Sequence, residues 1–158
     1  MKQRLAIVLG TLLLCACGSK TIFEQEHIFS NNVWNRFTPE LFEIEVNNIN
    51  DYYDIEFSAS IDTTCYRYDV LPVMVNLYGP SGEQRQFYGT IPFKDHGHWR
   101  GKNEGGFQQA NWRIRSYFSF NSKGTHRMEV TQQTSQYDLE GVQSLAVTIN
   151  KAKLDYDF

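Results

Sequence analysis

Alternation of apolar and polar residues is the feature that most constrains the fold of this 158-residue chain. In residues 41–47, Phe42, Ile44 and Val46 alternate with Glu43 and Glu45, and residues 53–61 carry apolar side chains at every second position. Alternation with period two predicts β-strands that bury one face and leave the other in water. Because long stretches with apolar residues at helical spacing are missing from the sequence, we expect an all-β fold.

Turn residues divide the chain into about eight short strands. Residues 71–77 alternate in the same way, and the stretch Gly79–Gly82 supplies a glycine–proline turn, so residues 70–93 predict a β-hairpin. Pro72 is expected at a strand start or a sheet edge because it has no amide hydrogen to donate. Eight strands with almost no helix predict an antiparallel β-sandwich with the strand number of a jelly roll.

The second half of the chain continues the alternation. Residues 125–134 place His126, Met128 and Val130 on one face, and a last strand is marked by three apolar residues in 145–149. The strand at 112–120 is expected to have one face made of Trp112, Ile114, Ser116, Phe118 and Phe120, opposite Arg113, Arg115 and Tyr117.

The first residues have the pattern of a secretory signal. Two basic residues, Lys2 and Arg4, precede an apolar run over residues 5–14. A membrane-spanning helix needs about 20 apolar residues, so this run is too short to cross a bilayer. A basic start followed by a short apolar core is typical of a signal peptide, which we assign to residues 1–16.

The end of that signal predicts the form of the mature protein. The stretch Leu14-Cys15-Ala16-Cys17 resembles a bacterial lipobox, with Cys17 as the lipidated first residue. The alternative is an ordinary signal cut after Ala16 that leaves a free thiol. We therefore expect a lipidated tether at 17–22 and a β-sandwich domain at 23–158, held to the membrane by acyl chains. Gly18, in place of an aspartate that retains lipoproteins at the inner membrane, favours the outer membrane. No acidic pair that would mark export to the surface follows directly, so we expect the periplasmic face.

The mature composition limits the possible partners. The signal contains Lys2 and Arg4 but no acids, so 13 of the 15 basic residues and all 18 acidic residues remain, for a formal net charge of −5. This charge argues against nucleic acid as a partner, because nucleic-acid binding needs a basic patch. Cys65 is the only cysteine after Cys17, so no internal disulfide is expected, and we predict a buried or half-buried thiol.

The segment 94–106 is the least strand-like part of the domain and the best candidate for a binding site. It contains four glycines and the candidate binding residues His98, Trp99, Arg100 and Lys102. Loops held by a rigid sheet often carry function, and Trp and Arg dominate binding hot spots. The simpler interpretation is a long connection between strands, fixed by a buried Trp99.

Two other chemistries for this segment have weaker support. His96 and His98 could supply two metal ligands if the chain is extended there, but the further ligands have no recognisable spacing. The glycines form no phosphate-binding Gly-x-x-x-x-Gly-Lys motif. We therefore predict neither a metal nor another cofactor.

Catalytic motifs are missing from the sequence. It contains no Gly-x-Ser-x-Gly, His-Glu-x-x-His or Ser-x-x-Lys motif. The carboxylate pairs Glu43/Glu45 and Asp54/Glu56 lie on the polar side of the alternation, so we interpret them as solvated sheet faces. The sequence predicts a protein without enzymatic activity.

Several short motifs, in their order and spacing, resemble the gliding-motility lipoprotein H (GldH) family. After the lipobox come Asn32-Val33-Trp34-Asn35, the strand "DTTCYRYDVLPVMVNLY", "HGHWRGK", "SKGTHRMEVTQQT" and Leu139-Glu140-Gly141-Val142. The resemblance covers about residues 23–150. The family pattern differs after Lys102 and before Leu139, which marks a divergent member.

The resemblance implies an outer-membrane lipoprotein of surface motility and the type IX secretion apparatus, without a known enzymatic activity or cofactor. Its expected partners are the membrane, through Cys17, and an envelope protein. The high aromatic content, 15% of residues, and the strand count leave a carbohydrate-binding module of the envelope as the alternative function.

Overall fold

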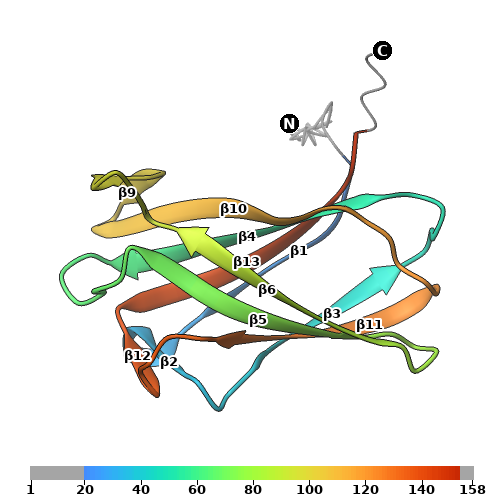
Figure 1. Ribbon diagram of the computed structural model, residues 1–158, viewed down its shortest axis with the longest axis horizontal. Helices are drawn as coiled ribbons and strands as arrows, with labels where there is room; N and C mark the ends of the chain where they lie inside the picture. Colours follow the sequence, from blue (N-terminus) through green and yellow to red (C-terminus); the bar gives the residue numbers. More distant parts are fainter. Residues whose placement is uncertain (1–19, 154–158) are drawn as a thin grey trace, which may run out of the picture.

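The computed structural model describes residues 20–153, which form two antiparallel β-sheets packed face to face (Figure 1). The first sheet has five strands in the order β1-β13-β4-β10-β9, and the second has four in the order β3-β11-β5-β6. The strands of the first sheet are β1 (Thr21–Ile28), β13 (Val142–Lys151), β4 (Tyr53–Asp62), β10 (Phe107–Phe118) and β9 (Lys102–Glu104). Those of the second are β3 (Glu40–Val46), β11 (Gly124–Gln132), β5 (Val70–Tyr78) and β6 (Gln84–Pro92).

Two small ladders and one short helix complete the described part. Strand β2 (Val33–Asn35) pairs with β12 (Asp138–Glu140), and β7 (Lys94–Asp95) pairs with β8 (His98–Trp99). The 3₁₀ helix η1 (Ser30–Asn32) follows β1. Within residues 20–153, no helix is long and apolar enough to cross a membrane.

The strand order is that of a jelly roll. Eight strands have seven or more residues, and numbered along the chain they form the sheets 1-8-3-6 and 2-7-4-5. The second half of the chain therefore pairs back onto the first half, as in the two Greek keys of a jelly roll. This confirms the predicted all-β sandwich of about eight strands.

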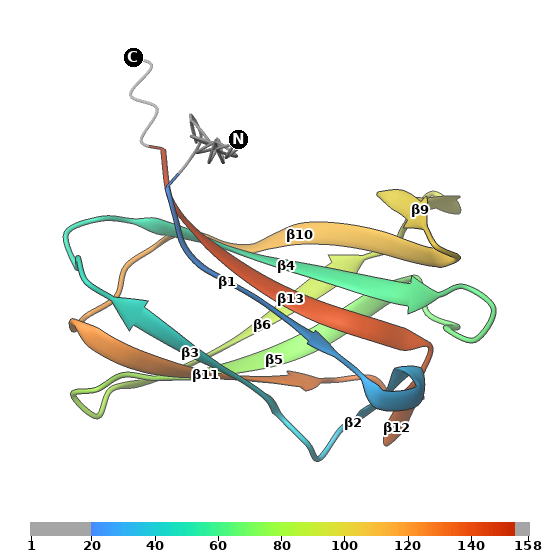
Figure 2. The ribbon, with the colours of Figure 1, turned by 180° about the vertical axis from the view of Figure 1, so that it is seen from behind.

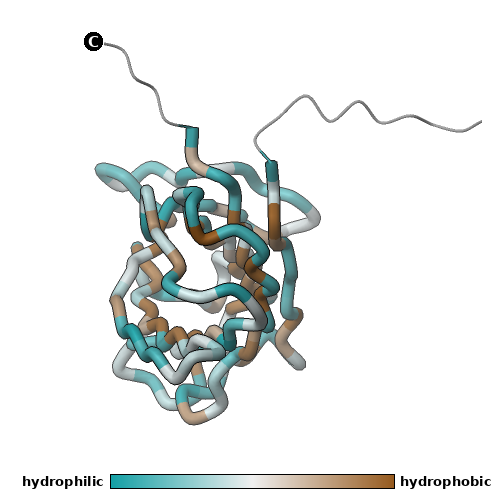
Figure 3. Tube along the Cα trace, turned by 90° about the vertical axis from the view of Figure 1, so that its right-hand side faces the viewer, coloured by the Kyte–Doolittle hydropathy of each residue, from teal (hydrophilic) through white to brown (hydrophobic). Residues whose placement is uncertain are grey.

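The core lies between the sheets and contains the apolar side of the predicted alternation. In Figure 3, seen along the long axis, the chain surrounds this interior, and apolar and polar positions alternate along it. Phe42 of β3 and Phe57 of β4 are both fully buried, each from a different sheet. Trp34 is also fully buried and stacks on Phe29, so the small β2–β12 ladder closes one end of the core. The predicted hairpin at 70–93 is confirmed by the β5–β6 pairing.

The structure tests three local expectations: the start of the domain, the burial of Cys65 and the position of Pro72. The first strand begins at Thr21, and Ile22 packs against the core, so the folded domain begins two residues before the expected residue 23. The prediction of a buried or half-buried thiol at Cys65 is wrong. Cys65 is exposed because it lies in the loop after β4, with its Sγ 3.7 Å from Asp62 Oδ2. Pro72 is the third residue of β5 and lies beyond the last β11–β5 pair, near the strand start as predicted.

The predicted faces of residues 112–120 are confirmed only in part. Ile114 and Phe120 are buried and Phe118 packs against the core, as the alternation predicts. Strand β10 has register shifts between Arg113 and Arg115 and again between Arg115 and Phe118. The first shift places Arg115 opposite the buried Ile55, with its guanidinium carbon 4.6 Å from the ring centre of Phe87, instead of on the outer face with Arg113. A bulge adds an unpaired residue and interrupts the alternation, which a period-two pattern cannot indicate.

The antiparallel register defines two ends of the sandwich. Thr21 at the start of β1 pairs with Asn150 near the end of β13, and the loops 47–52, 79–83 and 119–123 lie at the same end. We call this the N-terminal end. The opposite end, here the far end, carries η1 and the loops 62–69, 93–106 and 133–141 (Figure 2).

Candidate functional site

The predicted binding segment 94–106 is two tight hairpins rather than a long loop. His96 and Gly97, with φ of 47° and 80°, form the turn between β7 and β8. Gly105 and Gly106, with φ of 59° and 86°, form the turn between β9 and β10. Two-residue hairpins favour positive φ at both central positions, which explains why glycines recur in this segment.

The four predicted binding residues lie in this segment but do not converge on one point. Trp99 is 42% exposed, not buried, and Lys94 Nζ lies 4.6 Å from the centre of its ring. Arg100 turns to β10, with its guanidinium carbon 5.0 Å from the ring of Trp112. His98 is exposed on β8, and Lys102 lies on β9. Of the four, only Lys102 lines a hollow described below.

The metal hypothesis depended on an extended chain between His96 and His98. That condition is not met, because His96 occupies a turn with positive φ whereas His98 is in β8. Across residues 20–153, no group of three or more His, Cys, Asp or Glu side chains is arranged to hold a metal ion.

Gly101 fixes the position of β9 beside the first sheet. Its φ is +72°, and a Cβ atom there would lie 1.9 Å from the backbone oxygen of Gln109. Only glycine allows this approach of two backbones. The Gln108 amide also donates to the Arg100 oxygen over 2.7 Å. As a result the β9 hairpin stands beside the outer face of the sheet as a wall, visible above the end of β10 in Figures 1 and 2.

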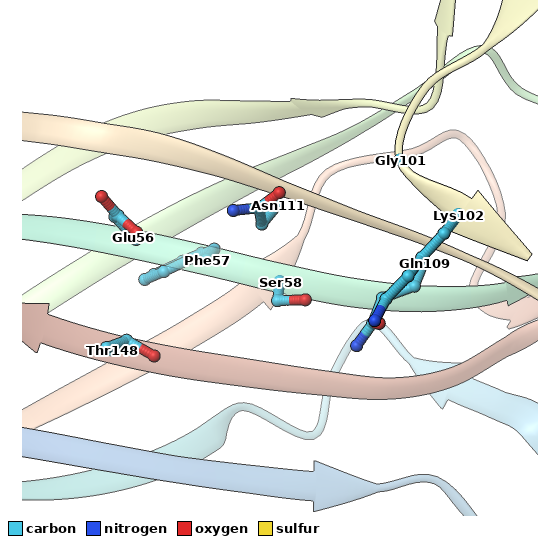
Figure 4. A pocket seen from close by; sticks show the side chains of 8 residues that line it. All are labelled: Glu56, Phe57, Ser58, Gly101, Lys102, Gln109, Asn111 and Thr148. Atoms are coloured by element: carbon cyan, nitrogen blue, oxygen red, sulfur yellow. The ribbon is translucent and has the colours of Figure 1, made fainter. Parts of the chain in front are cut away.

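A hollow of about 480 Å³ lies against this wall on the outer face of the five-stranded sheet (Figure 4). Its floor is the β4 backbone at Phe57 with the small side chain of Ser58. The residues around the floor come from four strands and from the residue before β9: Glu56, Gly101, Lys102, Gln109, Asn111 and Thr148. Lys102 and Gln109 are directly paired across β9 and β10, so both side chains lie on the same face.

The charged side chains at this hollow form ion pairs with one another. Arg113 donates to Glu56 Oε1 over 3.1 and 3.2 Å and lies 3.3 Å from Asp54 Oδ2. Lys102 Nζ is 3.7 Å from Glu104. By contrast, among the described residues no bond occupies the amides of Gln109 and Asn111 or the hydroxyls of Ser58 and Thr148. Asp54 and Glu56 thus lie on the outer face of the sheet, as predicted. They are ion-paired with Arg113 and lie beside hydrogen-bonding groups that have no partner among the described residues.

A buried polar cluster lies elsewhere, at the N-terminal end. Ser122 donates to Glu83, and this hydrogen bond holds the pKa of the Glu83 carboxyl below its ordinary value. His126 Nε2 lies 3.6 Å from Glu83, and His126 is only 1% exposed. Because the serine bonds the glutamate rather than the histidine, and the histidine is covered, the cluster lacks the serine–base contact and the access that nucleophilic catalysis needs.

Sequence reasoning missed the outer-face hollow because its residues come from four separate strands. Asn111 and Ser58 are far apart in the sequence but directly opposite each other in the β10–β4 register. Thr148 faces Glu56 through the β13–β4 register. The one sequence feature that pointed to the hollow was the set of small polar residues on the outer side of β4. That feature does not indicate which strands pair with β4.

The fold and its surface define an antiparallel jelly-roll protein. The profile of the GldH lipoprotein family matches residues 21–149, from the first residue of β1 into β13. The chain therefore belongs to the GldH lipoprotein family, which is not a known enzyme family. No significantly similar curated protein or solved structure was found.

Proposed function

We propose that this chain is a non-catalytic outer-membrane lipoprotein, anchored by lipid on Cys17, that binds an envelope protein with the far end of its sandwich. Membership in a lipoprotein family and the lipobox at 14–17 support the anchor. In this family the partner would belong to the gliding-motility and type IX secretion machinery. Gly18 favours location at the outer membrane, and the lack of an acidic pair directly after it favours the periplasmic face.

The position of the first strand is the observation that carries the proposal. Only three residues separate Cys17 from Thr21, where β1 begins. Four residue steps span at most about 14 Å when fully extended. Lipid on Cys17 would hold the N-terminal end of the sandwich close to the membrane and direct the far end into the aqueous space.

The far end carries exposed aromatic side chains. Phe37 is 74% exposed and Tyr137 65% exposed, and their ring centres are 5.4 Å apart. Trp99, at 42% exposure, is on the β7–β8 hairpin of the same end. Aromatic residues are enriched at protein interfaces, so this end is the favoured surface for a partner.

Lipid labelling tests the anchor. Cys17→Ser should abolish incorporation of a labelled fatty acid and release the domain from the membrane fraction, because the acylated thiol is lost. Cys15→Ser is the matched control and should leave labelling unchanged, since Cys15 would be removed with the signal. Labelling that depends on Cys15 and persists in Cys17→Ser would contradict the proposed mature start.

Site-specific photo-crosslinking tests the binding surface. A photoreactive phenylalanine analogue at Phe37 or Trp99 should crosslink an envelope protein in living cells. The same analogue at Tyr52, which is 46% exposed at the N-terminal end, is the control and should not. Crosslinks that form equally at Tyr52, or at none of the three positions, would rule out the far end as the docking surface.

A further inference from the structure

The hollow beside β9 continues along β4 in both directions. Towards the N-terminal end it shares Glu56 with a hollow of about 290 Å³. Towards the far end it shares Gln109 with a hollow of about 270 Å³. Together they form the polar trough, which follows the outward side chains of β4: Asp54, Glu56, Ser58 and Ser60. Six residue steps at roughly 3.3 Å each give it a length of about 20 Å, which suits an extended chain rather than a single small molecule.

The trough exists because small and large side chains are separated on this face. Ser58 faces Ala146 of β13 and Asn111 of β10, and Ser60 faces Ser144. These short side chains leave the middle of the sheet low, while the β9 hairpin raises one border at Gly101.

One aromatic side chain lines the N-terminal part of the trough through an unusual backbone conformation. Tyr117 has φ of 51°, which is rare for a bulky residue, and lies within the register shift between Arg115 and Phe118. The bulge places Tyr117 in the hollow with Asp54, whose carboxylate accepts its backbone N–H over 3.2 Å. Its side chain is 54% exposed. Bulges and strained residues of this kind often direct a side chain towards a binding site.

From these observations we propose that the polar trough binds a neutral oligosaccharide, with Asn111, Gln109, Ser58 and Thr148 bonding its hydroxyl groups and the Tyr117 ring packing on a sugar face. Side-chain amides and hydroxyls both donate and accept, as sugar hydroxyls do. This second site lies on the flank of the sandwich, uses none of the far-end aromatics, and does not require the lipid anchor.

The same surface argues against other ligands. An anion would need free cations along the trough, but Arg113 is paired with Asp54 and Glu56, Lys102 with Glu104, and Lys151 with Asp51. Among the described residues only Lys153, at the N-terminal limit of the trough, lines it without an ion pair. An apolar ligand would cover the unbonded amides and hydroxyls of this face without offering them hydrogen-bond partners, which costs free energy. A peptide strand bonds best to a sheet edge, where backbone groups are free, whereas the trough lies on a face whose backbone groups are already in the β4 ladders.

Binding to defined glycans tests the proposal. The full chain, purified in detergent, is titrated with neutral tetra- to hexasaccharides of glucose, mannose and N-acetylglucosamine, with an alginate oligomer as the acidic probe. We expect at least one neutral series to bind, and binding to persist at high salt because no ion pair is formed with the ligand. Absence of neutral-sugar binding, or binding of the acidic oligomer alone, would overturn the proposal.

Variants locate the site. Asn111→Ala and Tyr117→Gly should each weaken binding about tenfold, as expected for the loss of one or two direct contacts. Glycine suits the positive φ of position 117, so the ring is removed without straining the fold. Tyr88→Ala is the matched control, because Tyr88 is 60% exposed on β6 of the other sheet and should leave affinity unchanged.

The outcomes separate this proposal from the proposed function. Unchanged affinity in both trough variants, with unchanged melting temperatures, would show that any sugar binds elsewhere and would refute the site. Crosslinking at Phe37 or Trp99 would survive that result, because those residues lie outside the trough. Conversely, loss of the far-end crosslinks would leave the sugar titration untouched.

Discussion

The outer faces of the two sheets arise from the same alternation of residues but differ in how they use their polar side chains. On the four-stranded sheet several of these side chains bond to one another. Gln86 donates to Asn76 over 2.8 Å, and Thr125 donates to Glu45 over 2.8 Å. Arg127 bridges to Glu129 at 3.1 Å. On the five-stranded sheet the charged groups are paired in a similar way, and Thr21 donates to Asn150 over 2.6 Å. Among the described residues, however, no side-chain hydrogen bond occupies the four polar groups in the middle of the trough: Ser58, Gln109, Asn111 and Thr148.

Side-chain size accounts for the difference. Neighbouring long side chains, such as Tyr78 and Arg127, cover the four-stranded face, with the guanidinium 4.7 Å from the ring centre. Ser58 and Ala146 are too short to reach across to the amides beside them, although Ser58 is directly opposite Asn111. The polar side chains of a sheet face can thus bond to one another, or they can remain available to a ligand. A few small residues decide which of the two occurs.

The inner faces of the two sheets should not differ in how they contribute to stability. Substitutions there have the largest expected effect. Phe57→Ala beneath the trough and Phe42→Ala in the four-stranded sheet each remove a fully buried ring. Both should lower the free energy of unfolding by about 3–5 kcal/mol, as measured by urea denaturation. A much smaller cost for Phe57→Ala would mean that the floor of the trough is not part of the common core.

A substitution at Gly101, in the wall of the trough, should cause the next largest loss of stability. Gly101→Ala should cost roughly 1–2 kcal/mol for its left-handed backbone and about 1–3 kcal/mol more for the collision with the Gln109 oxygen. Gly97→Ala is the control, because Gly97 has φ of +80° but nothing within 4 Å of a Cβ atom. It should show only the backbone cost. Equal losses in thermal unfolding would indicate that β9 is free to move away and that the wall is not rigid.

Most of the sandwich could be predicted from the sequence because the alternation within each strand indicates which of its faces is buried. The alternation through Phe42, Ile44 and Val46 was confirmed, as was the hairpin at 70–93. The jelly-roll order follows from pairings between distant strands, which a local pattern cannot specify, so only the strand number suggested it. The GldH resemblance was confirmed by the match over residues 21–149.

The candidate site was predicted far less well. The dipeptides His96-Gly97 and Gly105-Gly106 are hairpin-turn signals and could have indicated that 94–106 is two hairpins instead of a loop. The placement of Tyr117 depends on a bulge that has no sequence signature. The trough itself depends on the register of β4 with β10 and β13, so its residues could not be grouped before the pairing was known.

The smallest expected effect is the coupling free energy between two side chains that lie opposite each other on an outer face. Measuring it for one pair on each sheet compares the two faces directly. A double-mutant cycle of Asn76→Ala and Gln86→Ala should give a coupling of about 0.2–1 kcal/mol, because that cross-strand pair is hydrogen-bonded. The same cycle with Ser58→Ala and Asn111→Ala should give none, since these side chains face each other without a bond. Both cycles are measured by chemical denaturation without ligand. A clear coupling between Ser58 and Asn111 would mean that the trough satisfies itself as the other face does, and its amides would then not be free for a ligand.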